Sequence, residues 1–103
     1  MGEIKAIIVD DNLSFRNALK DVLKNKFSIN IIGEAGCGEE FMQLPYLYQA
    51  DVILMDLNLP DTDGIQLVKQ SLNRMSGLKF IAITMYNDEV YLLSLIGAGF
   101  KGC

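Results

Sequence analysis

The chain has 103 residues, half of them hydrophobic, and a formal net charge of −4 from 13 acidic against 9 basic side chains. A chain of this length and composition forms one domain around a single core, and it is too apolar for intrinsic disorder. Its acidic balance excludes a basic surface for nucleic acid or anionic lipid, and no apolar stretch approaches the ~20 residues of a membrane helix. We therefore expect one cytoplasmic domain spanning residues 1–103 that contacts neither nucleic acid nor membrane directly.

Strand-like and helix-like patterns alternate along the chain. Short apolar runs are typical of strands buried on both faces, and apolar residues three or four apart are typical of helices with one buried side. In chain order these patterns predict a strand at 4–9, a helix at 14–26, a strand at 29–33, a helix at 39–44, a strand at 52–57, a helix at 65–73, a strand at 79–84 and a helix at 88–96. Asn12 or Ser14 can cap the first helix, and Asp63 the third. Pro45 should end or kink the second.

This alternation with short connections predicts an α/β fold, with a doubly wound parallel sheet and helices on both of its faces. Right-handed crossovers leave few topologies open, and among them we expect the flavodoxin-like strand order 2-1-3-4-5. Residues 100–103 would begin the fifth strand, so we expect that strand to be incomplete and a fifth helix to be absent. The first and third strands would lie side by side.

Polar residues stand at the ends of three predicted strands. Asp10 and Asp11 follow the first strand, Asp56 ends the apolar run of the third, and Thr84 closes the fourth. The carboxyl ends of parallel strands share one edge of the sheet, where ligands bind, and neighbouring strands are ~4.8 Å apart. Clustered carboxylates are unfavourable without a cation, and Mg2+ prefers oxygen ligands. We therefore predict a magnesium site in which Asp11 is a ligand, Asp10 binds directly or through water, and Asp56 is the candidate nucleophile toward phosphorus.

Each of these residues also has an ordinary structural interpretation. Asp10 and Asp11 alone would be a turn and a helix cap, and Asp56 alone would be about equally a loop residue or a functional one. Thr84 alone says little, because threonine is common in strands. Their joint occurrence at three strand ends favours the functional interpretation.

The chain resembles the receiver domain of two-component response regulators. The motifs that carry the resemblance are Val-Asp-Asp-Asn at 9–12, Met-Asp-Leu-Asn-Leu-Pro-Asp-Thr-Asp-Gly at 55–64, Ile-Thr-Met at 83–85 and the glycine-rich tail at 96–103. The third motif and the tail are most similar to the branch whose members carry a C-terminal helix-turn-helix of the LuxR/NarL type. The resemblance covers essentially the whole chain and implies that the parent protein is a transcription regulator.

The resemblance also implies roles for individual residues. Asp56 would accept a phosphoryl group from the phosphohistidine of a sensor histidine kinase, and Thr84 would turn its hydroxyl toward the phosphoryl oxygens. Asp10, Asp11, Asp56 and the backbone carbonyl of Asn58 would surround Mg2+. The domain would not be an enzyme in its own right, beyond self-catalysed phosphoryl transfer and hydrolysis.

The tail departs from the family pattern at its end. Cys103 stands where the family has an aromatic residue, and the position of the family's lysine lies beyond Cys103. Lys101 does not replace that lysine, whose loss removes a charge-assisted hydrogen bond on the order of 1.5–3 kcal/mol. A second hypothesis is therefore a receiver-fold interaction or oligomerisation module that no longer switches. A metal-dependent phosphatase of the dehalogenase type is disfavoured, because it would need a second acid where the chain has Asn58.

The predicted helix at 88–96 is apolar nearly all the way round, where a lone surface helix would show one stripe. Its apolar residues are Val90, Tyr91, Leu92, Leu93, Leu95 and Ile96. We expect the chain to self-associate through this fourth-helix face, including as a dimer that exchanges elements between chains.

Overall fold

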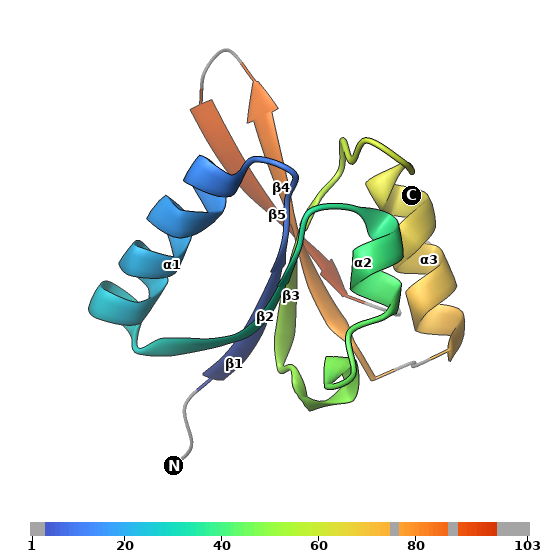
Figure 1. The fold of residues 1–103 in the computed structure, drawn as a ribbon, viewed down its shortest axis with the longest axis horizontal. Coiled ribbons are helices and arrows are strands. Elements are labelled where there is room, and N and C mark those ends of the chain that lie inside the picture. The colour runs from blue at the N-terminus through green and yellow to red at the C-terminus, as the bar shows by residue number, and fades with distance from the viewer. Residues whose placement is uncertain (1–3, 75–76, 87–88, 97–103) are drawn as a thin grey trace.

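The computed structural model describes residues 4–74, 77–86 and 89–96, and for 84–86 and 89–96 it describes the backbone. A sheet with helices on both faces makes up the molecule (Figure 1). Its elements in chain order are β1 (Ile4–Val9), α1 (Leu13–Phe27), β2 (Ile29–Ala35), α2 (Gly38–Met42), a 3-10 turn (Leu47–Gln49), β3 (Val52–Asp56), α3 (Gly64–Arg74), β4 (Lys79–Tyr86) and β5 (Glu89–Ile96). The strand order in space is β2-β1-β3-β4-β5.

The first four strands are parallel and have the predicted order 2-1-3-4. Val9 at the end of β1 lies opposite Met55 of β3, and Asp56 lies opposite Ile83 of β4. The carboxyl ends of these strands therefore meet at one edge, as the sequence pattern predicted. This confirms a doubly wound sheet, with α1 on one face and α2 and α3 on the other (Figure 1).

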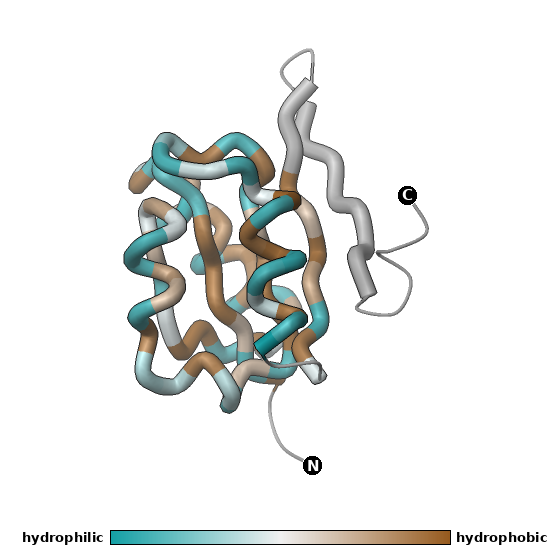
Figure 2. The backbone as a smooth tube through the Cα atoms, turned by 90° about the vertical axis from the view of Figure 1, so that its right-hand side faces the viewer, coloured by the Kyte–Doolittle hydropathy of each residue, from teal (hydrophilic) through white to brown (hydrophobic). Residues whose placement is uncertain are grey.

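Two hydrophobic clusters sandwich the sheet, because alternate side chains of each strand point to opposite faces. Ile7, Val9, Ile53 and Met55 belong to the larger cluster, which also contains Phe41 of α2 and Leu67 and Val68 of α3. Ile8, Leu54 and Ile83 form the smaller cluster, against which Phe15, Leu19 and Leu23 of α1 pack. Figure 2 shows the matching alternation of hydrophilic and hydrophobic residues along the helices. The sheet thus has a strongly buried centre, which fixes the ends of β1 and β3.

The helix boundaries follow from the caps that the sequence offers. The Asn12 side chain accepts a hydrogen bond from the Phe15 N–H at 3.0 Å, and the Asp63 side chain accepts one from the Ile65 N–H at 2.8 Å. Both caps were predicted, and α2 ends at Met42, ahead of Pro45, also as predicted. Among the described residues, no helix has the length and apolar character needed to cross a membrane.

The prediction of a fourth helix at 88–96 is wrong. Residues 89–96 form β5, which runs antiparallel to β4 with Lys79 opposite Ile96 and Tyr86 opposite Glu89. An apolar run without a clear period fits a helix and a strand equally well, and the β-branched and aromatic residues within it favour a strand.

The correction changes two further expectations. The fifth position of the sheet is filled by the antiparallel β5, whereas the fifth strand predicted at 100–103 lies outside the described residues. The predicted self-association face has no helix to carry it. The last residues of β4 run past the end of β3 and pair with β5, so this hairpin extends beyond the other strands (Figure 1).

Candidate metal centre

Three carboxylates meet at the carboxyl ends of two neighbouring strands. Asp10 and Asp11 follow β1, Asp56 ends β3, and one oxygen of each lies within 4.8 Å of the others. Asp10 is buried, Asp56 is half-buried and Asp11 is exposed. They come together because Val9 and Met55, the residues just before them, are partners in the parallel pairing of β1 with β3. The structure thus brings together the acidic residues that the sequence singled out.

The two strand ends present their carboxylates through the same local turn. Oδ1 of Asp10 accepts a hydrogen bond from the Asn12 N–H at 2.8 Å, and Oδ1 of Asp56 accepts one from the Asn58 N–H at 2.9 Å. Within the described ranges, Oδ2 of each of these two aspartates has no hydrogen-bond partner. Each carboxylate is therefore oriented by one oxygen while the other remains available.

Burial and mutual repulsion disfavour the charged forms of two of these acids. Burial raises the pKa of Asp10, and the charges of Asp56 and Asp11 raise it further, against the lowering effect of the Asn12 N–H and of Arg16. Burial likewise raises the pKa of Asp56, as does the charge of Asp11, while the Asn58 N–H lowers it. A bound cation would relieve both effects, since it offsets the repulsion and the lost hydration.

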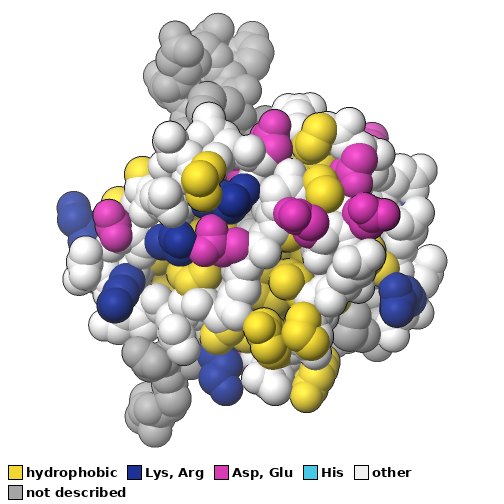
Figure 3. Space-filling model, viewed as in Figure 1, with side chains coloured by type: hydrophobic (Ala, Val, Ile, Leu, Met, Phe, Trp, Pro, Cys, Tyr) yellow, Lys and Arg dark blue, Asp and Glu magenta, His cyan; other side chains and the backbone are white. Residues whose placement is uncertain are grey.

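The acids line a pocket of about 230 Å³ that opens to solvent. Asn12, Asn58, Phe15 and Ile83 complete its lining. This volume holds a cation together with several waters, which Mg2+ usually keeps in protein sites. Donors that are all oxygen also match the preference of Mg2+, so the residues present fit that ion. In the space-filling view, most of the visible acidic side chains lie on the half of the molecule that contains this edge of the sheet (Figure 3).

The structure describes the other residues named in the sequence analysis to different extents. Asn58 lines the pocket, which is compatible with the predicted carbonyl ligand. The backbone of Thr84 belongs to β4, one position past Ile83, the partner of Asp56. The Thr84 side chain lies outside the described part of the structure, as do Lys101 and Cys103.

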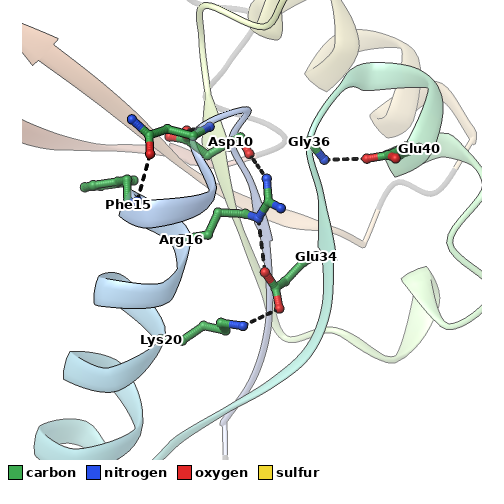
Figure 4. A network of polar contacts seen from close by, with 8 residues as sticks. Asp10, Phe15, Arg16, Lys20, Glu34, Gly36 and Glu40 are labelled. Carbon is green, nitrogen blue, oxygen red and sulfur yellow. Dashed lines mark hydrogen bonds and ion pairs between the residues drawn. The ribbon is translucent and has the colours of Figure 1, made fainter.

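Sequence reasoning did not identify the charged residues behind the pocket. Arg16 of α1 reaches the backbone carbonyl of Asp10 and the side chain of Glu34, which also binds Lys20 (Figure 4). Lys20 and Arg16 are one helical turn apart, and Glu34 is the charged residue of β2. That charge in β2 was the available signal, because a half-buried charge is stabilised by a partner of opposite sign.

A second missed residue, Asp61, holds the loop that follows Asp56. Its carboxylate accepts hydrogen bonds from the Gly38 N–H at 2.8 Å and the Glu39 N–H at 3.0 Å, at the start of α2. These backbone bonds lower the pKa of Asp61. The loop is further closed by the Gly64 N–H, which donates to the Leu57 carbonyl at 3.0 Å.

Comparisons with a family model and with curated proteins point to the same family. A family model described as the response regulator receiver domain matches residues 6–103. The chain is 34% identical over 99 residues to the DNA-binding transcriptional activator DevR/DosR of Mycobacterium tuberculosis, and 35% identical over 96 residues to the transcriptional regulatory protein LiaR of Bacillus subtilis. These alignments cover 96% and 93% of this chain but 46% of each relative, so the chain spans about half the length of these curated relatives.

A solved structure agrees with the sequence comparison. The isolated REC domain of RcsB from Salmonella enterica serovar Typhimurium, determined with the phosphomimetic BeF3-, is 29% identical with a TM-score of 0.73. The similarity covers 84% of this chain and 64% of that one. Because the family match runs over nearly the whole sequence and the four-strand parallel sheet has the expected order, the chain belongs to the response regulator receiver domains of two-component systems.

Proposed function

We propose that Asp56 accepts a phosphoryl group from the phosphohistidine of a sensor histidine kinase, with Mg2+ held by Asp10, Asp11, Asp56 and the backbone carbonyl of Asn58. The observation that carries this proposal is the meeting of three carboxylate oxygens within 4.8 Å at the ends of β1 and β3. Asp56 is the candidate acceptor because it ends the central strand β3 and its Oδ2 accepts no hydrogen bond from the described residues.

The proposed transfer exchanges one bond to phosphorus for another. Oδ2 of Asp56 attacks phosphorus, the P–N bond to the imidazole breaks, and the nitrogen keeps that electron pair, so a ring protonated on its other nitrogen leaves neutral. The product is an acyl phosphate, which water later hydrolyses to Asp56 and inorganic phosphate. Bound Mg2+ would supply positive charge beside both the carboxylate and the incoming phosphoryl oxygens. Receiver domains are phospho-acceptor modules, and we propose no catalysis by this chain beyond its own phosphorylation and dephosphorylation.

The surrounding residues have supporting roles in this proposal. The Asn58 N–H holds Oδ1 of Asp56, which leaves Oδ2 for the attack. Thr84 would turn its hydroxyl toward the bound phosphoryl group, since its backbone lies one position past the β4 partner of Asp56. The parent protein would be a cytoplasmic transcription regulator with a LuxR/NarL-type DNA-binding region, because the relatives named above are transcription regulators.

A second candidate function is an interaction module of receiver fold that does not switch. The observation that favours it is β5, which takes the place beside β4 that a fifth parallel strand would fill in the expected order. Receiver domains can dimerise, and we propose that this chain self-associates through the outer edge of β5. Among the described strands β5 is the last of the sheet, and exposed strand edges pair readily with other chains. A monodisperse monomer in sedimentation experiments would contradict this self-association.

Phosphorylation by a small donor separates the two candidates. The protein is incubated with Mg2+ and acetyl phosphate, and intact-mass spectrometry is used to detect one added phosphoryl group. We expect the wild type and Asp21→Asn, a control at an exposed aspartate of α1, to gain that mass. Asp56→Asn should gain none. Phosphorylation of Asp56→Asn would show that the acceptor is wrongly assigned, and an unmodified wild type would favour the interaction module.

A further inference from the structure

The side chain of Arg16 lies behind the acidic pocket and joins the ends of two strands. Its Nη1 donates to the backbone carbonyl of Asp10, and its Nε donates to Oε1 of Glu34 at 3.0 Å (Figure 4). The Arg16 side chain is only 15% exposed. One guanidinium therefore links α1, the end of β1 and the last part of β2.

Glu34 holds this arginine in one orientation. Its second oxygen, Oε2, accepts a hydrogen bond from Nζ of Lys20 at 2.6 Å, so both carboxylate oxygens are engaged. The space around the guanidinium is also confined: a Cβ added at Gly36 would lie 3.3 Å from Arg16 Nη1 and 3.3 Å from Glu40 Oε1. Glu40 itself is held by the Gly36 N–H at 2.6 Å. Arg16 thus occupies a closely fitted position between two strand ends.

The carbonyl that Arg16 binds belongs to the peptide group between Asp10 and Asp11. Because a peptide group is planar, fixing its carbonyl also restricts the direction in which the chain enters Asp11. The Asp10 N–H is held as well, by the Ala35 carbonyl at 3.0 Å, and the Asp10 side chain is held by the Asn12 N–H. The contact from Arg16 adds a bond to the carbonyl at the step from the first carboxylate to the second.

We propose that Arg16 is a positioning residue for the divalent cation of this pocket. By holding the peptide between Asp10 and Asp11, it sets the spacing of their carboxylates and thereby the affinity of the pocket for Mg2+. The inference rests on the proposed function in that it requires the three acids to bind a cation. Since Glu34 already pairs with the charge of Arg16, the effect on the pocket comes mainly from directed hydrogen bonds rather than from net positive charge.

Substitutions at Arg16 separate geometry from charge. Arg16→Met removes the charge and both bonds, whereas Arg16→Lys keeps the charge but loses the forked geometry. Lys20→Met is the matched control, because it breaks the other half of the pairing with Glu34 and leaves the Asp10 carbonyl untouched. Binding of Mn2+, as a substitute for Mg2+, is followed through the electron paramagnetic resonance signal of the free ion.

We expect both Arg16 variants to bind Mn2+ about tenfold more weakly, since residues that orient metal ligands typically contribute on this scale. Lys20→Met should bind within about twofold of the wild type. In ¹H–¹⁵N spectra of the metal-free proteins, the amide signals of Asp11 and Asn12 should shift in the Arg16 variants but not in Lys20→Met. If Arg16→Met does not fold, Arg16→Lys provides the same comparison.

Unchanged Mn2+ binding in folded Arg16 variants would overturn the inference. An equal loss of Mn2+ affinity in Lys20→Met would also overturn it, because it would indicate a general effect of the ion pairs on stability. The binding measurement needs no phosphorylation. Suppose that the wild type binds Mn2+ but takes no phosphoryl group, and that the Arg16 variants bind Mn2+ more weakly as predicted. That result would support the role of Arg16 and contradict only the proposed phosphorylation.

Discussion

The two loops that present the acidic residues start alike and are held differently. The loop after β1 and the loop after β3 each begin with an aspartate whose Oδ1 accepts the N–H two residues later. The first loop is held by Arg16, which donates to the Asp10 carbonyl and is itself paired with Glu34. The second loop is held mainly by its own backbone and by close packing at Gly64. The same turn can therefore be fixed by ion pairs or by steric fit, and the two loops should respond to different perturbations.

Added volume should damage the loop after β3 most. A Cβ at Gly64 would lie 2.5 Å from the carbonyl oxygen of Asp56 and 2.6 Å from the Cα of Leu57, so the backbone has to move. We expect Gly64→Ala to lower the free energy of unfolding by about 1–3 kcal/mol, the usual range for overpacking, as measured by urea denaturation. Gly77→Ala is the control, because its Cβ would meet no atom of the described residues within 4 Å. Equal losses in the two variants would contradict a steric role for Gly64.

Loss of charge should damage the loop after β1. Glu34→Gln keeps the shape of the side chain but weakens its bonds to Arg16 and Lys20, and we expect a loss of about 1 kcal/mol near neutral pH. Burial raises the pKa of Glu34, but the bonds from Lys20 and Arg16 outweigh it and bring the pKa below 4.5. A lowered pKa in the folded state means that the ionised form stabilises the fold.

The pH profile tests the origin of that loss. The contribution of Glu34 should be present above about pH 4.5 and disappear as the pH falls through its lower folded-state pKa. The difference between wild type and Glu34→Gln should therefore shrink in acid. Thermal unfolding measured between neutral and acidic pH gives this difference directly, and a loss that stays constant with pH would point to packing instead.

The sequence predicted the acidic cluster but neither the contact of Arg16 with Glu34 nor the strand β5. Asp10, Asp11 and Asp56 were correctly expected to meet, because strand periodicity and the crossover rule fix which strand ends are neighbours. The contact of Arg16 with Glu34, 18 residues apart, also depends on the rotation of α1 and the register of β2, which the pattern does not contain. The segment 88–96 was predicted to be a helix, whereas 89–96 form a strand, because a nearly uniformly apolar run has no period that distinguishes a helix from a strand.

Where the two loops meet, their acids should repel one another without metal. Burial and the charge of Asp11 raise the pKa of Asp56 above 3.8 in the folded state. Any contribution of this carboxyl group to the stability of the fold is therefore complete below pH 3.8, and it is lost as the pH rises through the folded-state pKa. At neutral pH its ionisation therefore opposes folding. We expect Asp56→Asn to raise the thermal midpoint of the metal-free protein by about 3 °C, and this gain should vanish in acid. Added Mg2+ should stabilise the wild type more than the variant, and a lower midpoint for metal-free Asp56→Asn would contradict the repulsion.

The smallest effect is expected at Asp61, whose charged side chain ties the loop after β3 to the start of α2. Its carboxylate binds two N–H groups of α2, but it lies at the surface, so water replaces much of what a substitution removes. Asp61→Ala should lower the unfolding midpoint less than Glu34→Gln does. The backbone bonds lower the pKa of Asp61, so its contribution should be present above about pH 3.8 and be lost as the pH falls through the folded-state value. If Asp61→Ala proved as damaging as Gly64→Ala, the loop after β3 would depend on charge as much as the loop after β1, and the contrast between them would fail.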